Sequence, residues 1–295
     1  MDQAQGLRNV VKAQNVINTK EARIITITSG KGGVGKSNCA VNLALQFRKM
    51  GKRVIILDAD FGLANVEVLC GTVPKYNLSD YIFGESELEE IITAGPEGIG
   101  FISGGSGIVK LNNLNSDQLN GVIYGLSKLN QLCDVLLIDT GAGVSETVMS
   151  FVLSSPEVIV VTTPEPSSIT DAYSLIKAVY KSDGARRGTL PTLFILANRI
   201  VASDEGAAVY EKLNSVVGKF LGGSLSYLGD IPSDALLETA VRNQQIVSLV
   251  SPAAKSSRAF YEVANRLLGN DSGGQKSLGL FGFFNSFIKK QGDIR

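Results

Sequence analysis

The sequence predicts an α/β fold with a mostly parallel sheet that is flanked by helices on both faces. Three observations carry this prediction: apolar runs of strand length, periodic helical segments after most of them, and no composition break between Ile24 and Leu268. Parallel strands are buried on both faces, so their sequences are nearly continuous in Val, Ile and Leu. A chain of 295 residues has room for one large domain or two small ones, and the unbroken pattern favours one.

The alternation gives the following elements and boundaries. The predicted strands are Ile24 to Thr28, Arg53 to Leu57, Ile99 to Ser103, Val135 to Ile138, Val158 to Thr162, Thr192 to Ala197 and Ser226 to Gly229. The predicted helices are Asn38 to Met50, Ser116 to Leu132, Ser145 to Leu153, Ser168 to Lys181, Ala207 to Leu221 and Ala253 to Leu268. The predicted organisation is an N-terminal segment (1–20), a domain (21–269), a polar glycine-rich linker (270–277) and a C-terminal helix (278–295).

Composition excludes several kinds of chemistry. The chain has no histidine, which rules out histidine acid–base catalysis and histidine metal sites. Its formal net charge of zero argues against a nucleic-acid partner. Cys39, Cys70 and Cys133 lie in apolar runs and are interpreted as reduced core residues of a cytoplasmic protein. We find neither a secretion signal nor an apolar run long enough to span a bilayer.

The segment from Gly30 to Ser37 matches the phosphate-loop pattern G-x-x-x-x-G-K-[ST]. In this pattern backbone N–H groups surround phosphates, Lys36 reaches the β- and γ-phosphates, and the Ser37 hydroxyl holds Mg²⁺. The strand before it and the helix after it aim a helix N-terminus at an anion. The residues expected to bind ATP are Gly30, Lys31, Gly32, Gly33, Val34, Gly35, Lys36, Ser37 and Asn38. Lys31 is not required by the pattern, and a second lysine here is typical of one branch of nucleotide switches.

Acidic residues follow two predicted strands at the edge where parallel sheets bind ligands. Asp60 is a candidate to orient the attacking water, and Asp58 to support the metal or the loop. Asp139 ends an apolar strand as a Walker B aspartate does, and its carboxylate is expected to meet Mg²⁺. For each of the three, the alternative is a helix N-cap.

Two later strands also end in polar residues. Asn198 offers an amide donor and acceptor that suit an adenine edge, and Pro232 and Asp234 follow the next strand. We expect these three residues at the base of the nucleotide. The alternative is that they are turn residues.

Together these motifs resemble the MinD/ParA group of P-loop ATPases, and the resemblance covers most of the chain. The motifs are Lys31-Gly32-Gly33-Val34-Gly35-Lys36-Ser37, Asp58-Ala59-Asp60, Asp139 and Pro164-Glu165-Pro166-Ser167-Ser168. The resemblance implies an ATP-bound homodimer in which Lys31 reaches the partner's phosphates, Asp60 positions the water and Asn198 contacts adenine. Gly141 lies in the turn expected over 140–143 and departs from the proline of many relatives, which puts the rigidity of that turn in question.

The N-terminus resembles the DQAxxLR element of the FlhG family. This resemblance implies that Asp2, Gln3, Leu7 and Arg8 contact FlhF, an SRP-type GTPase, and stimulate its GTP hydrolysis. Polar contacts from Gln3 and Arg8 and an apolar contact from Leu7 suit such a partner. The alternative is an unstructured tail.

The C-terminal segment has an amphipathic pattern. At ~100° per residue, six apolar side chains fall within an arc of roughly 160°: Leu280, Phe281, Phe283, Phe284, Phe287 and Ile288. Such a helix can lie in the headgroup region of an anionic membrane surface. The alternative is packing against the protein's own body or a dimer partner, and the FlhG resemblance favours reversible attachment to the inner face of the cell membrane.

The resemblance therefore implies an ATP-dependent, dimerising and membrane-associating ATPase. Its expected role is control of flagellar number and placement, with FlhF and flagellar basal-body and C-ring proteins as partners. The alternatives are a positioning ATPase for the division site or DNA and an adaptor that binds ATP without hydrolysing it. An Fe–S carrier of the Mrp type needs a close cysteine pair, which the sequence lacks.

Overall fold

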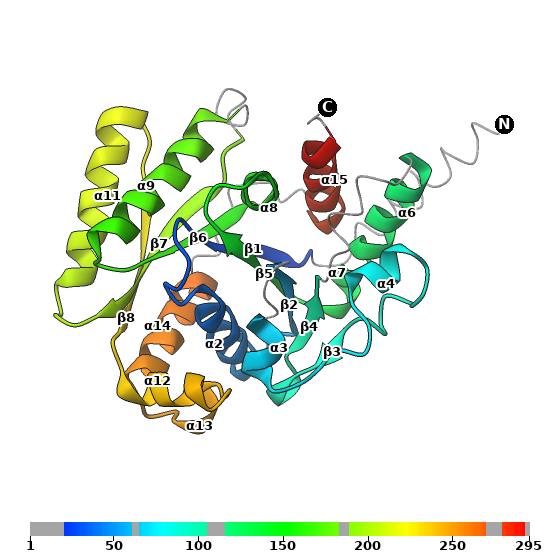
Figure 1. Ribbon diagram of the computed structural model, residues 1–295, viewed down its shortest axis with the longest axis horizontal. Coiled ribbons are helices and arrows are strands. Elements are labelled where there is room, and N and C mark those ends of the chain that lie inside the picture. The colour runs from blue at the N-terminus through cyan, green and yellow to red at the C-terminus, as the bar shows by residue number, and fades with distance from the viewer. Residues whose placement is uncertain (1–20, 61–64, 105–115, 183–188, 270–278, 293–295) are drawn as a thin grey trace.

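The computed structural model describes residues 21–60, 65–104, 116–182, 189–269 and 279–292 (Figure 1). Its centre is an eight-stranded sheet of order β3-β4-β2-β5-β1-β6-β7-β8, in which β3 is antiparallel to β4 and every other pair is parallel. The strands are β1 (Arg23–Ser29), β2 (Val54–Ala59), β3 (Thr93–Ala94), β4 (Gly100–Ser103), β5 (Val135–Ala142), β6 (Glu157–Thr162), β7 (Thr192–Ile200) and β8 (Ser226–Pro232). The predicted fold class and all seven predicted strands are confirmed.

Helices cover both faces of this sheet (Figure 1). One face carries α2 (Lys36–Lys49), α3 (Asn65–Cys70), α12 (Ala235–Arg242), α13 (Val247–Val250) and α14 (Lys255–Gly269). The other carries α4 (Leu78–Ile82), α6 (Ser116–Ser127), α7 (Leu129–Leu132), α8 (Glu146–Ser154), α9 (Pro166–Lys181), α11 (Glu205–Leu221) and α15 (Gly279–Gly292). A short 3-10 turn, η1 (Pro96–Gly98), joins β3 to β4. The single helix predicted over 116–132 is two helices, α6 and α7.

Strand β1 shows how the sequence divides between the two faces. Its residues are buried from Ile24 to Ser29, and successive side chains of a strand point to opposite sides. Ile25 and Ile27 belong to the apolar cluster under α2 and α14, whereas Ile24 belongs to the cluster under α15. Both faces of β1 therefore contribute side chains to an apolar cluster.

The C-terminal helix α15 packs on the body between α6 and α8 (Figure 1). Five of its six predicted apolar residues are buried there, namely Leu280, Phe283, Phe284, Phe287 and Ile288. The Phe287 ring stacks on Phe151 of α8 with centroids 4.1 Å apart, and the Ser154 hydroxyl donates to Ser286 Oγ at 3.2 Å. Phe281 is 47% exposed. In this structure the amphipathic face covers the protein's own core, and its use on a membrane stays a prediction.

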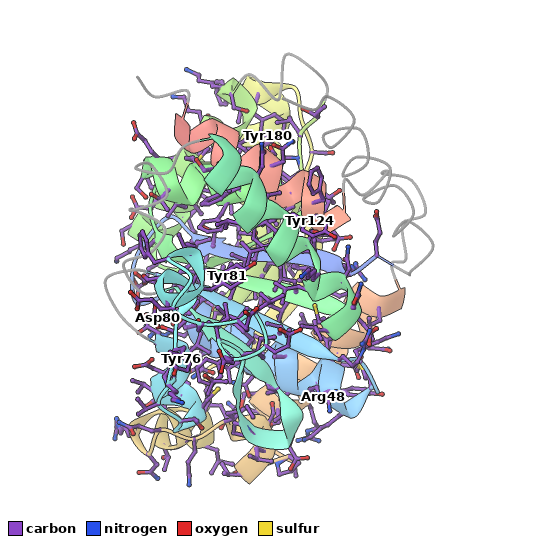
Figure 2. All side chains as sticks on the ribbon, turned by 90° about the vertical axis from the view of Figure 1, so that its right-hand side faces the viewer. Arg48, Tyr76, Asp80, Tyr81, Tyr124 and Tyr180 are labelled. Carbon is purple, nitrogen blue, oxygen red and sulfur yellow. The ribbon has the colours of Figure 1, made fainter. Side chains whose placement is uncertain are left out.

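A second contact on this flank involves Tyr81 of α4 (Figure 2). Its hydroxyl lies so close to Gly125 of α6 that any larger side chain there would overlap it. Burial raises the pKa of the Tyr81 phenol. The small residue thus lets α4 pack on α6. The predicted partner residues Asp2, Gln3, Leu7 and Arg8, and the predicted linker 270–277, lie outside the described residues.

Candidate functional site

The phosphate loop joins β1 to α2 at the carboxyl edge of the sheet. Gly33 and Gly35 have φ of 78° and 95°, a left-handed conformation that other residues adopt at a cost. Gly35 is the N-cap of α2 and supplies no side-chain hydrogen bond, so the first N–H groups of the helix remain available to an anion. A Cβ on Gly30 would overlap the backbone of Asp171 in α9, so only glycine lets that helix approach the loop.

Lys36 and Asp139 meet beneath this loop. Lys36 Nζ lies 3.5 Å from Asp139 Oδ1, and both residues are buried. Burial raises the pKa of the Asp139 carboxyl, while Lys36 and the Ser37 hydroxyl oppose the shift. The other carboxylate oxygen, Oδ2, is buried and has no hydrogen-bond partner among the residues that the structure describes. An oxygen left open beside a hydroxyl and an ammonium fits Mg²⁺ bound with a nucleotide phosphate.

The same donor set explains how Mg²⁺ would be held. Within the described ranges, no group of three or more carboxylates, thiols or imidazoles is assembled. Mg²⁺ commonly takes one or two carboxylates together with substrate phosphates and water. The residues present therefore fit a metal that arrives with the nucleotide, with Ser37 and Asp139 as its protein ligands.

Asp58 has a structural task that can be read from its contacts. Its two carboxylate oxygens accept hydrogen bonds from the backbone N–H of Asp60 (3.2 Å) and of Val66 (3.1 Å). Burial, and next the charge of Asp139, raises the pKa of Asp58 to about 7. Asp58 thus links the end of β2 to the start of α3. Its part in metal binding stays a prediction.

Asp60 is half-buried at the carboxyl end of β2. Asn65 Nδ2 donates to its Oδ2 at 3.4 Å. A Cβ built on Gly141 of β5 would lie 3.7 Å from Asp60 Oδ1, so the carboxylate lies next to the end of that strand. The turn expected over 140–143 begins only at Gly143, because β5 continues to Ala142. Asp60 therefore lies at the carboxyl edge of the sheet, and its role in positioning a water stays a prediction.

Lys31 is held by its own chain in this structure. Its Nζ donates to Ser167 Oγ at 2.9 Å and to Glu165 Oε2 at 3.3 Å, both at the start of α9. The sequence identified this segment as a family motif but assigned no role to these two residues. The signal that would have found them is an acidic residue and a hydroxyl just beyond a strand that neighbours the loop.

The residues predicted to contact the base divide into two groups. Asn198 lies beside the phosphate loop, where its Nδ2 donates to the Val34 carbonyl at 2.7 Å. Asp234 caps α12 and α14 instead: it accepts from the N–H of Leu236 and from the N–H and hydroxyl of Ser256. Burial raises the pKa of Asp234, but these hydrogen bonds outweigh it, and the net shift is downward. Contact of Asn198, Pro232 and Asp234 with adenine stays a prediction.

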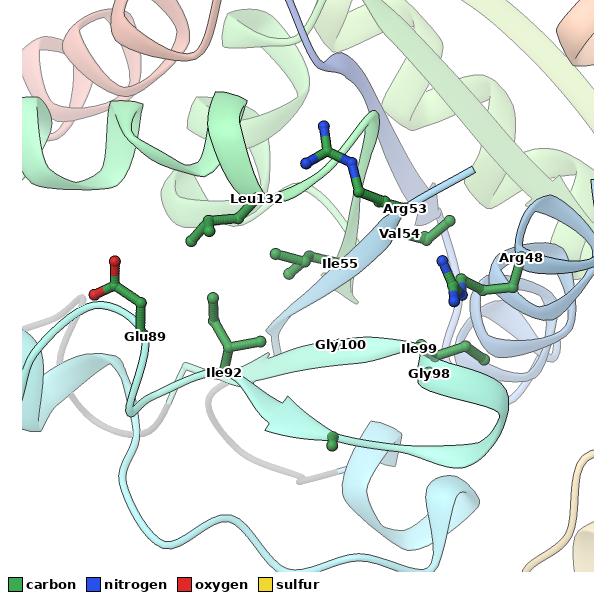
Figure 3. Close-up of a pocket in the computed structure, with 11 residues that line it drawn as sticks. Arg48, Arg53, Val54, Ile55, Glu89, Ile92, Gly98, Ile99, Gly100 and Leu132 are labelled. Atoms are coloured by element: carbon green, nitrogen blue, oxygen red, sulfur yellow. The ribbon is translucent and has the colours of Figure 1, made fainter. Parts of the chain in front are cut away.

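A separate pocket of about 350 Å³ lies at the opposite edge of the sheet (Figure 3). Its walls include Ile55, Gly100 and Leu132, with Arg53 at the side. Arg53 pairs with Asp134 at 2.9 Å, and this partner raises the pKa of the guanidinium. Because the pocket lies near the amino ends of β2 and β4, it is remote from the phosphate loop.

Each described helix is too short or too polar to cross a lipid bilayer.

Comparisons with known proteins agree with this geometry. Residues 20–268 match the ParA family, described as NUBPL iron-transfer P-loop NTPase. Antiactivator FleN of Pseudomonas aeruginosa is 42% identical over 245 residues, which are 83% of this chain and 86% of FleN. The flagellum site-determining protein YlxH of Helicobacter pylori is 35% identical over 300 residues, 99% of each chain.

A solved structure extends the match to the fold. The septum site-determining protein MinD of Pyrococcus horikoshii, complexed with Mg-ADP, superposes with a TM-score of 0.66 and 26% identity. The superposition covers 86% of this chain and 98% of that one. The chain therefore belongs to the ParA/MinD family of P-loop NTPases, with FleN and YlxH among its relatives.

Proposed function

We propose that this protein is an ATPase that binds MgATP, dimerises and attaches reversibly to a membrane to regulate flagellar number and placement. The observation that carries the proposal is the second lysine of the phosphate loop, Lys31, in a chain 42% identical to FleN. The names of both relatives support the cellular role, since one is an antiactivator and the other a flagellum site-determining protein.

Binding uses the groups at the carboxyl edge. The loop amides and Lys36 hold the phosphates, while Ser37 and Asp139 would hold Mg²⁺, which would supply charge neutralisation on the phosphate oxygens. When the nucleotide arrives, the Lys36 ammonium exchanges its 3.5 Å contact with Asp139 for a phosphate oxygen. Asp139 Oδ2, which has no hydrogen-bond partner among the described residues, is the carboxylate oxygen that would hold the Mg²⁺.

Dimerisation uses Lys31. Its exposed ion pair with Glu165 is weak, because solvent screens such pairs. Lys31 can therefore leave Glu165 and Ser167 and reach the phosphates of a second copy. Asp60 holds the attacking water for hydrolysis, and the return of Lys31 to its own chain accompanies dissociation.

Membrane attachment uses α15. The helix leaves its groove between α6 and α8 in the ATP state and turns its phenylalanines to the lipid surface. A short amphipathic helix binds weakly alone, whereas two copies in a dimer bind with higher avidity. Release of α15 thus links the nucleotide state to attachment.

Co-sedimentation with vesicles that contain anionic lipid tests the membrane step. The full chain should sediment with ATP and stay in solution with ADP, and deletion of residues 278–295 should abolish sedimentation. Sedimentation of the truncated chain would remove α15 as the anchor.

GTP hydrolysis by FlhF tests the partner. A peptide of residues 1–20 should stimulate FlhF, and the same peptide with Gln3→Ala should not. Equal rates with both peptides would contradict a role for Gln3. Binding of the nucleotide-loaded chain to flagellar C-ring proteins is the corresponding test for the basal body.

A further inference from the structure

Strand β7 carries an irregularity where it reaches the phosphate loop. Asn198 pairs with Ile231 of β8 and Ile200 pairs with Pro232, so Arg199 is an extra residue in β7. Its φ is 61°, a left-handed value that is uncommon outside glycine. A residue in this conformation persists only where its surroundings determine it, and such residues cluster at functional sites.

The bulge changes the direction of two neighbouring side chains. In a regular strand, successive side chains point to opposite faces. Here both point to the same loop: Asn198 Nδ2 donates to the Val34 carbonyl at 2.7 Å, and Arg199 Nη2 donates to the Gly33 carbonyl at 2.8 Å. The Asn198 side chain also accepts from the Arg199 N–H at 2.9 Å, which fixes the turn between them. Bulges beside active sites redirect side chains in this way.

These two bonds act on the part of the loop that carries left-handed glycines. Gly33 and Gly35 are left-handed, and Val34 between them is not. A run in which left-handed residues alternate with others turns successive N–H groups to one concave side. A carbonyl held from outside keeps its peptide plane from rotating, and this keeps the next N–H directed inward. These two hydrogen bonds are also independent of Lys36, because their donors lie on β7 and not on α2.

We infer that Arg199, together with Asn198, is a positioning residue that holds the phosphate loop in its anion-binding shape before nucleotide arrives. This inference rests on the proposed nucleotide site and adds a residue to it. Arg199 contacts the loop backbone in this structure, so its effect on ADP passes through the loop. Its side chain is exposed, so the bond is partly screened and its contribution is moderate.

The test is the affinity for Mg-ADP, measured by calorimetry on the full chain with Arg199→Gly. Glycine accepts the left-handed backbone, so the variant removes the guanidinium without adding strain. We expect Kd to rise about 3- to 10-fold. Arg199→Lys keeps a cationic donor, so its Kd for Mg-ADP should lie between those of the wild type and Arg199→Gly. Gln244→Gly is the matched control, because Gln244 has a similar φ of 54° away from the loop.

The remaining readouts separate positioning from other roles. The KM for ATP should rise in Arg199→Gly while kcat at saturating ATP stays unchanged, and the Tm without nucleotide should match that of Gln244→Gly. An unchanged Kd for Mg-ADP in Arg199→Gly, with normal binding by the wild type, would overturn the inference that Arg199 positions the loop. A fall in kcat equal to the rise in KM, or a fall in Tm without a change in Kd, would overturn it as well. Failure of the wild type to bind Mg-ADP would instead overturn the proposed nucleotide site.

Discussion

The phosphate loop and the C-terminal helix are held to the same sheet by different kinds of interaction. The loop is fixed by directional hydrogen bonds from Asn198 and Arg199 to its carbonyls. Helix α15 is fixed mainly by apolar packing, with Phe287 stacked on Phe151. Directional bonds select one conformation, whereas apolar burial is non-directional and is satisfied by another apolar surface. The difference suits a loop that keeps its shape and a helix that changes its partner.

The largest expected effect is the loss of nucleotide binding at the phosphate loop. Lys36→Ala should abolish measurable MgATP binding, because it removes the ammonium that reaches the phosphates and leaves Asp139 buried without its cation. Isothermal titration calorimetry measures this loss. Lys212→Ala removes an exposed lysine of α11 and should bind as the wild type does. Tight binding by Lys36→Ala would contradict the phosphate-loop assignment.

Asp60→Ala should separate binding from hydrolysis. The variant should bind ATP normally and remain dimeric, while its rate of phosphate release falls by about 10²- to 10⁴-fold, the contribution typical of a positioned acid–base group. Phosphate release and size-exclusion chromatography with ATP measure the two properties. Normal turnover would remove Asp60 from the mechanism.

Phe287→Ala weakens the packing of α15 on the body of the protein. Loss of a buried phenylalanine costs about 3–5 kcal/mol of packing. Because α15 is the last described helix, we expect it to detach and leave the sheet folded. Hydrogen exchange of α15 should accelerate in this variant. Phe281→Ala, at an exposed position of the same helix, is the control and should leave exchange unchanged. Global unfolding of Phe287→Ala would show that α15 is an inseparable part of the core.

The pH dependence of Mg-ADP binding tests the charge of Asp58 near the phosphate loop. Burial raises the pKa of Asp58 from 3.8 to about 7, so its carboxyl is protonated below that pH. A bound cation favours the ionised form, so affinity should rise between pH 6 and 8 and level off above. The rise should be at most about tenfold per pH unit below 7. Asp58→Asn should remove this dependence, and an identical pH profile in that variant would assign it to another group.

The smallest effect concerns Lys31. Glu165→Gln removes an exposed ion pair, and such pairs contribute about 0–1 kcal/mol. The population of ATP dimer should rise by about 2- to 5-fold, measured by analytical ultracentrifugation. Glu262→Gln makes the same charge change on α14 and should have no effect. Fewer dimers in Glu165→Gln would place Glu165 in the dimer contact itself.

The sequence predicted the parts of this molecule that are set by local patterns. The apolar runs that became β1 and β5 and the glycines of the phosphate loop specify their conformations directly. It missed β3, which has two residues and no periodicity. It also missed the bulge at Arg199, because that irregularity exists only in the pairing of β7 with β8.

Two other features depend on tertiary context for the same reason. The ammonium of Lys31 finds Glu165 and Ser167 only because β1 and β6 are neighbours in the sheet. The phenylalanines of α15 form the same apolar face for a membrane and for a protein groove, so periodicity alone leaves both occupants open. The structure shows the groove filled, with Phe283 and Phe287 nearly inaccessible to solvent.

Hydrogen exchange of α15 in Asp60→Ala, compared between ADP and ATP, tests most directly whether the two regions are coupled. The ADP form should protect the amides of residues 279–292 as the groove does in this structure. The ATP form should lose that protection, while the strands of the sheet keep theirs. Equal protection of α15 with both nucleotides would contradict the account, because the nucleotide state would then not control the helix.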